Sequence, residues 1–186
     1  MAIELLRRRF TVEEYHRMAL ASILGRDDRV ELIEGEIVTM TPSGVRHAAC
    51  VRRLNRLLSA RIGDRAIVDV QNPIRLSEHS EPQPDVALLR PRPDDYAHAH
   101  PGPEDVLLVV EVAETSAESD GAVTLPLYAR AGIAEVWLVD LTAETVEVHR
   151  GPPPQGYEAV QRVGPKQTVC PRTVPDLRLA TDDLLK

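Results

Sequence analysis

The chain has 186 residues and a net charge of −7 at neutral pH, and 43% of its residues are apolar. This length predicts a single domain over residues 1–186 with a buried core, and the apolar fraction argues against wholesale disorder. No apolar run approaches the roughly 20 residues of a membrane span, so no membrane partner is expected. The two cysteines are too few for a disulfide framework, and the first ten residues lack the apolar stretch of a secretory signal. These features predict a protein of the reducing cytoplasm.

The N-terminal part of the chain is predicted to form a helix and a hairpin. Thr11 followed by two glutamates is typical of an N-cap with acids in the first turn, and predicts a helix to about Leu24. From Val30 to Met40 apolar and acidic residues roughly alternate around a Glu-Gly pair, which indicates a β-hairpin.

An arginine-rich helix is predicted from about Val45 to Ile62, because apolar residues recur there at steps of three or four. The acidic net charge by itself argues against nucleic-acid binding. However, six arginines lie between residues 44 and 65 against a single acid. Their alternative role is a solvated helix face. The candidate contacts to a nucleic-acid backbone are Arg46, Arg52, Arg53 and Arg56.

The rest of the chain predicts an α/β fold with a mixed, twisted sheet. Residues 106–112 are almost all apolar without alternation, which is typical of a strand buried on both faces. A helix over 119–131 and a strand over 135–141 follow, and this spacing predicts a right-handed βαβ crossover. Further strands are expected at 66–76, interrupted near Asn72-Pro73, and at 85–89, 145–149, 157–163 and 167–170, with a helical turn at 182–185.

Two carboxylates are candidates for chemistry. Glu111 follows the most apolar run of the chain, where a carboxylate carries a desolvation cost unless a cation or hydrogen-bond donors meet it. The alternative is that the strand has reached solvent. Asp85 opens a neighbouring short strand, although Pro-Asp is also ordinary turn chemistry. Two carboxylates at the ends of adjacent strands would converge on a hard cation such as Mg²⁺.

An ordered set of segments resembles the Uma-two family of restriction endonucleases, within the PD-(D/E)xK nuclease superfamily. The segments extend over most of the chain in the family's order, and the ordered set is more specific than any single piece. They are ELIEGEIV (31–38), TPSG (41–44) with His47, QNPIRL (71–76), PQPDVALL (82–89), VVEV (109–112), LPLYARAGI (125–133) and WLVDL (137–141).

The resemblance implies a restriction-endonuclease-like core over about 44–141, with a central mixed sheet flanked by helices. It implies that Asp85 and Glu111 bind Mg²⁺ or Mn²⁺, with the carbonyl of Val112 as a further ligand. Glu31 and His47 fall at positions that resemble the family pattern, and are secondary candidates. For His47 a helix-surface or capping role is the alternative.

The chain departs from the family pattern at its lysine. A PD-(D/E)xK nuclease has a lysine two residues after the second carboxylate, where this chain has Ala113. In the Uma-two family the lysine lies on the following helix, four residues after an aspartate. Asp120 matches that aspartate, and Thr124 occupies the lysine position as the third candidate catalytic residue. Losing such an electrostatic contact costs on the order of 10²–10³ in rate. Arg75 or Arg130 are the candidate replacements, although arginine is a poor proton-transfer group.

Three functions remain open on these grounds. The first is a Mg²⁺-dependent endonuclease, intact or impaired, that hydrolyses DNA phosphodiesters. The second is a non-catalytic nucleic-acid-binding or dimeric interaction protein on the same fold, and a weaker third is a small-molecule hydrolase. Aromatic residues make up 3% of the chain, which disfavours stacking platforms for single strands and favours double-stranded DNA as partner. A homodimer is expected only by analogy with nucleases that address two strands.

Overall fold

The computed structural model describes residues 7–25, 27–40, 43–114, 117–151 and 156–185, except for the side chains of 117–120. Within these ranges no helix combines the length and the apolar character needed to cross a membrane.

The predicted N-terminal helix and hairpin are present. Helix α1 (Val12–Leu20) begins with a capping box between Thr11 and Glu14. The helix ends earlier than expected, because Ser22 has a φ of +58° and the backbone N–H of Ile23 donates to the Met18 carbonyl at 2.9 Å. Strands β1 (Val30–Ile33) and β2 (Glu36–Thr39) form an antiparallel pair. Both residues of the Glu34-Gly35 turn have positive φ, which suits the twist of a two-residue hairpin.

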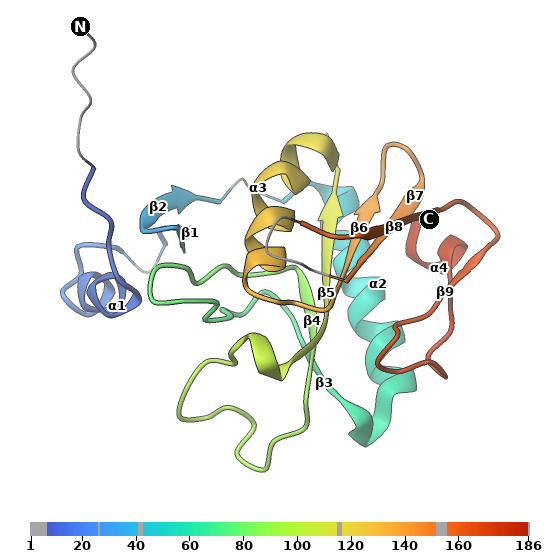
Figure 1. Cartoon of the computed structure of the whole chain (residues 1–186), viewed down its shortest axis with the longest axis horizontal. Helices are drawn as coiled ribbons and strands as arrows, with labels where there is room; N and C mark the ends of the chain where they lie inside the picture. Colours follow the sequence, from blue (N-terminus) through green and yellow to red (C-terminus); the bar gives the residue numbers. More distant parts are fainter. Residues whose placement is uncertain (1–6, 26, 41–42, 115–116, 152–155, 186) are drawn as a thin grey trace, which may run out of the picture.

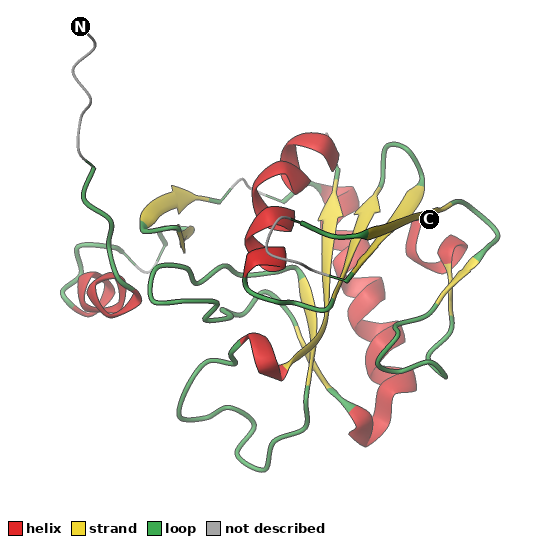
Figure 2. Cartoon of the chain, in the orientation of Figure 1, coloured by secondary structure: helices red, strands yellow, loops and turns green. Residues whose placement is uncertain are grey.

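Six strands form the central sheet in the order β3-β4-β5-β6-β7-β8. Neighbours β5 and β6 are parallel, and the other neighbouring pairs are antiparallel, so the predicted mixed sheet is confirmed. The strands are β3 (Ile67–Asp69), β4 (Val86–Leu89), β5 (Val106–Ala113), β6 (Glu135–Asp140), β7 (Thr145–Arg150) and β8 (Ala159–Val163). Figure 2 shows long loops on both sides of β4.

The prediction of a strand over 66–76 was wrong beyond Asp69, where β3 ends. Gln71 has a φ of +54°, which turns the chain out of the sheet two residues after β3 ends. The segment then pairs its backbone with residues of the next loop, where Gln71 N–H donates to the Pro84 carbonyl and Ile74 N–H donates to the Pro82 carbonyl. Residues 71–74 therefore form their backbone hydrogen bonds with the loop before β4 and not with a strand of the sheet. This pairing brings Gln71 close to the start of β4.

Two helices cover opposite faces of the sheet (Figure 1). Helix α2 (Val45–Ile62), with the predicted bounds, packs its apolar stripe against the face that carries Leu108 and Val110. Helix α3 (Ala117–Arg130) packs against the other face, which carries Val109. The sheet is buried on both faces along β5, and this explains why its sequence is apolar without alternation.

The C-terminal region forms a small two-stranded sheet and a short helix. Strands β9 (Thr168–Val169) and β10 (Leu179–Ala180) form a two-stranded sheet, of which β10 was not predicted. Helix α4 (Thr181–Leu185) follows, and its Leu184 and Leu185 belong to the same core as α2. Two short 3₁₀ helices, η1 (Gly63–Arg65) and η2 (Pro103–Asp105), complete the elements.

Candidate active site

The two candidate carboxylates meet at one end of the central sheet. Asp85 directly precedes β4, and Val86 pairs with Val110 in the antiparallel register of β4 and β5. This register places residue 85 opposite residue 111. The backbone N–H of Asp85 donates to Oε2 of Glu111 at 3.3 Å. The two acids, 26 residues apart in sequence, are therefore direct neighbours.

Hydrogen-bond donors from three segments hold the Asp85 carboxylate. Its Oδ2 accepts from the Val112 backbone N–H at 3.0 Å and lies 2.8 Å from Nε2 of His47, in the first turn of α2. Its Oδ1 accepts from the side-chain amide of Gln71 at 3.3 Å. The side chains of His47 and Asp85 are only 14% and 13% exposed. The helix-surface role considered for His47 was therefore wrong, because its ring faces Asp85.

Glu111 lies in an environment that disfavours its charge. Its Oε1 accepts a hydrogen bond of 2.6 Å from the hydroxyl of Tyr128, a buried residue of α3. Burial, and next the negative charge of Asp85, raise the pKa of Glu111 to about 8. The pKa of Glu31 is also raised, first by burial and then by Asp85, although a hydrogen bond from the Gln83 backbone lowers it. The site thus places carboxyl groups close together in surroundings that disfavour the charged forms of Glu111 and Glu31.

The acids line an open cavity of about 550 Å³. Four carboxylates and one arginine belong to the described residues around it. A phosphodiester entering such a cavity would meet repulsion unless a cation offsets the acids. The charged and polar lining residues are Arg29, Glu31, Thr39, Ser43, His47, Gln71, Gln83, Asp85, Glu111, Glu114, Thr124 and Tyr128.

The donor set fits a divalent cation with oxygen ligands. Asp85 and Glu111 are adjacent and partly buried, and burial together with the charge of Asp85 raises the pKa of Glu111. A divalent cation between them would remove that repulsion, and carboxylate and carbonyl oxygens are the ligands that Mg²⁺ and Mn²⁺ prefer. Val112, whose carbonyl is the third expected ligand, lines the same cavity.

The lysine position also belongs to the cavity. Thr124 is half-buried on α3, one helical turn before Tyr128, so residues 124 and 128 share a helix face. Asp120 lies one turn earlier on α3, and its side chain is outside the described residues.

The two arginines considered as replacements for the lysine are engaged elsewhere. Arg75 pairs with Glu13, and Arg130 pairs with Glu34 at 2.6 Å. Neither belongs to the described lining of the cavity. That expectation was therefore wrong, and Arg29 is the arginine that lines the cavity among the residues described there.

Several residues of the site were not singled out from the sequence. Tyr128 carried a signal, because it lies four residues after Thr124 and shares its helix face. Arg29, at the start of the hairpin, had no sequence pattern that marked it as a site residue. Glu114 also had none, although its carboxylate accepts from the backbone N–H of His47 at 3.4 Å. Tyr128 comes from α3, Glu114 directly follows β5 and Arg29 directly precedes β1, so these residues reach the cavity only through the packing of separate elements.

The four candidate arginines of α2 divide into two groups. Arg46 donates to the Leu141 carbonyl at 2.6 Å, and half-buried Arg53 donates to the Leu184 carbonyl at 3.5 Å. These two help to attach α2 to neighbouring elements. Arg52 and Arg56 are exposed and remain the better placed candidates for contact with a partner.

The family model of Uma2 (Uma-two), described as "Putative restriction endonuclease", matches residues 12–182. The chain belongs to the Uma2 family. A solved structure with a similar fold is described as a "putative nuclease belonging to DUF820 from Anabaena variabilis ATCC 29413". It superposes with a TM-score of 0.73 over 95% of this chain and 97% of that chain, at 18% sequence identity. At this identity the likeness establishes the nuclease-like fold alone. No curated protein sequence matches this Uma2 chain.

Proposed function

We propose that this Uma2 protein is a divalent-metal-dependent endonuclease that hydrolyses phosphodiester bonds of double-stranded DNA, with chemistry weakened by Thr124. The observation that supports it best is the adjacent pair of Asp85 and Glu111 inside an open cavity at the end of the sheet. The family and the fold support a nuclease in general. The metal, the substrate and the roles of single residues are parts of the proposal.

The chain's own residues would orient the site. His47, Gln71 and the Val112 backbone hold the Asp85 carboxylate in one orientation, and Tyr128 does so for Oε1 of Glu111. Bound to Asp85, Glu111 and the Val112 carbonyl, Mg²⁺ or Mn²⁺ would lower the pKa of a water and offset charge on the phosphate. Hydrolysis of a phosphodiester adds the oxygen of a water to phosphorus, breaks one P–O ester bond, and passes one proton of the water to the leaving oxygen.

A second candidate function follows from the lysine position. Thr124 supplies a hydroxyl and no positive charge, and Arg29 is the arginine in the described lining. A site that holds a metal but lacks this charge would bind DNA without efficient cleavage. The alternative is therefore a non-catalytic DNA-binding protein with the same metal requirement.

Cleavage of supercoiled plasmid is the direct test. The full chain is expected to convert the plasmid to the nicked form in Mg²⁺ or Mn²⁺, and not in EDTA. Asp85→Asn is expected to remove this activity, because it removes one charge of the pair while keeping a similar shape. Plasmid binding without nicking in either metal would favour the non-catalytic alternative. Nicking that survives in EDTA would contradict the proposed chemistry.

The exposed arginines of α2 give a prediction about binding. Arg52 and Arg56 lie roughly 8 and 14 Å along the helix axis from His47 and on the exposed side of α2, so they would contact DNA phosphates outside the cavity. The double variant Arg52→Ala/Arg56→Ala is expected to lower the slope of log affinity against log salt by about 1–2. Fluorescence anisotropy with duplex DNA at several salt concentrations measures it.

The matched control for this measurement is Arg17→Ala, which removes an exposed arginine from α1. It is expected to leave the salt dependence unchanged. An equal loss of slope in both proteins would show that general charge, and not the α2 surface, governs binding.

A further inference from the structure

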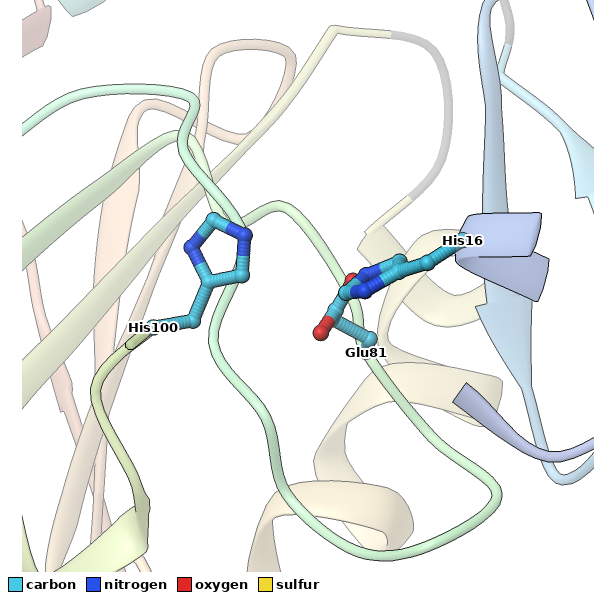
Figure 3. A group of neighbouring side chains, drawn as sticks. All are labelled: His16, Glu81 and His100. Carbon is cyan, nitrogen blue, oxygen red and sulfur yellow. The ribbon is translucent and has the colours of Figure 1, made fainter. Parts of the chain in front are cut away.

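A second group of metal-ligating side chains lies away from the Asp85–Glu111 site. His16 comes from α1, Glu81 from the loop before β4, and His100 from the loop between β4 and η2. Their ligand atoms all lie within 4.8 Å of one another. Figure 3 shows Glu81 between the two histidines, with each of the three side chains on a separate segment. The fold therefore gathers three groups that are distant in sequence.

Glu81 is the buried member of this group. Its side chain is 2% exposed, and its Oε1 lies 2.6 Å from Nε2 of His16. Its Oε2 is buried and has no hydrogen-bond partner among the described residues. The backbone is held in place, because the Glu81 N–H donates to the Leu32 carbonyl of β1 at 2.8 Å. A buried carboxylate oxygen without a partner is costly, and a bound cation would satisfy it.

Among the described lining residues of the cavity beside this group, Arg75 is the arginine. Arg75 lines the same cavity but forms its ion pair with Glu13. The cavity has a volume of about 420 Å³ and is also lined by His98. It shares no described lining residue with the Asp85–Glu111 cavity. There is thus room beside the group for a water molecule as a further ligand.

We propose that His16, Glu81 and His100 form a binding site for a divalent transition metal of the Zn²⁺ class, with water in the remaining position. Two imidazoles and one carboxylate are a ligand set of Zn²⁺, whereas Mg²⁺ prefers oxygen ligands alone. In a tetrahedral site with ligands at about 2.0–2.1 Å, ligand atoms lie roughly 3.4 Å apart. Here Nε2 of His16 and Oε1 of Glu81 are 2.6 Å apart, and all three ligand atoms lie within 4.8 Å of one another. Shifts of about 1 Å in the more exposed imidazoles reach that geometry.

The consequence of this site would be mechanical. It would attach α1 to two loops that flank β4, at a position four residues before Asp85. The metal would thereby stabilise the arrangement of the N-terminal helix and the segment that leads into the candidate active site. This role is independent of whether the chain cleaves DNA.

Zn²⁺ titration of the metal-depleted full chain by calorimetry tests the proposal. His16→Ala and His100→Ala are each expected to weaken one Zn²⁺ site by at least about 100-fold, since loss of a ligand exceeds the loss of its supporting contacts. Co²⁺ serves as a spectroscopic probe, because its visible absorption becomes much stronger when the ion moves from water into a four- or five-coordinate protein site. That absorption is expected in the native chain and in Asp85→Asn, and absent in the His16 and His100 variants.

His98→Ala is the matched control, because it removes a histidine of the same loop that lies outside the three-residue group. It is expected to retain Zn²⁺ binding. In EDTA the melting temperatures of His98→Ala and His100→Ala should agree with that of the native chain, since both histidines are exposed. His16→Ala should melt lower, because it removes the partner of Oε1 of the buried Glu81. Unchanged Zn²⁺ affinity in the His16 and His100 variants, or equal loss in His98→Ala, would overturn the assigned ligand set.

Discussion

Replacing Glu111 by glutamine is expected to stabilise the metal-free protein at pH 8 and to abolish its stabilisation by Mg²⁺. The wild-type carboxylate is next to Asp85 and accepts from Tyr128. Its pKa is raised from 4.5 to about 8, first by burial and then by Asp85. A group whose pKa is higher in the folded than in the unfolded state stabilises the fold at low pH. That contribution is lost as the pH rises from about 4.5 toward 8.

Glutamine keeps the size of Glu111 and removes its charge. The gain over the wild type should therefore be near zero at pH 5 and on the order of 2–4 kcal/mol at pH 8. Thermal unfolding in EDTA across this pH range measures it. Added Mg²⁺ should raise the melting temperature of the wild type, because a ligand at 100 times its dissociation constant stabilises by about 2.7 kcal/mol. The variant should show no such increase.

Glu114→Gln is the matched control for this prediction. It removes one negative charge from the same cavity without touching the Asp85–Glu111 pair. The control should keep the increase in melting temperature with Mg²⁺. If Glu111→Gln is less stable than the wild type at pH 8, or is still stabilised by Mg²⁺, the pair is not the metal site.

Replacing Thr124 by lysine is expected to increase plasmid cleavage by on the order of 10²–10³. Residue 124 lines the cavity and lies one helical turn before Tyr128, whose hydroxyl contacts Glu111 at 2.6 Å. A lysine at this position would therefore extend along the Tyr128 side of α3 toward the carboxylate pair. Its ammonium would supply the positive charge that Thr124 lacks.

The measurement compares initial nicking rates of Thr124→Lys and the wild type at saturating Mg²⁺. Thr124→Met is the control, since methionine approaches the length of lysine without its charge. Asp85→Asn in the Thr124→Lys background should return the rate to zero. Equal rates for the methionine, lysine and wild-type proteins would mean that no charge is missing at this position.

The fold and the candidate site were predictable wherever the signal was local. The capping box at Thr11, the Glu-Gly hairpin turn and the apolar stripe of α2 each depend on residues a few positions apart. The apolar run of β5 likewise reports burial on both faces of one strand. These patterns predicted the mixed α/β fold. They could not predict that β3 ends at Asp69, because its end depends on a left-handed Gln71 and on pairing with a distant loop.

The amino-acid sequence by itself determined most elements, the apolar central strand, and the two acids as candidates with threonine at the lysine position. Tertiary structure alone decided which groups meet. The register of β4 and β5 joins Asp85 to Glu111, and α2 brings His47 to them. The same holds for the cluster around Glu81, whose members come from three segments. Such meetings depend on strand register and on the packing of helices and loops around the sheet, which couple residues far apart in the chain.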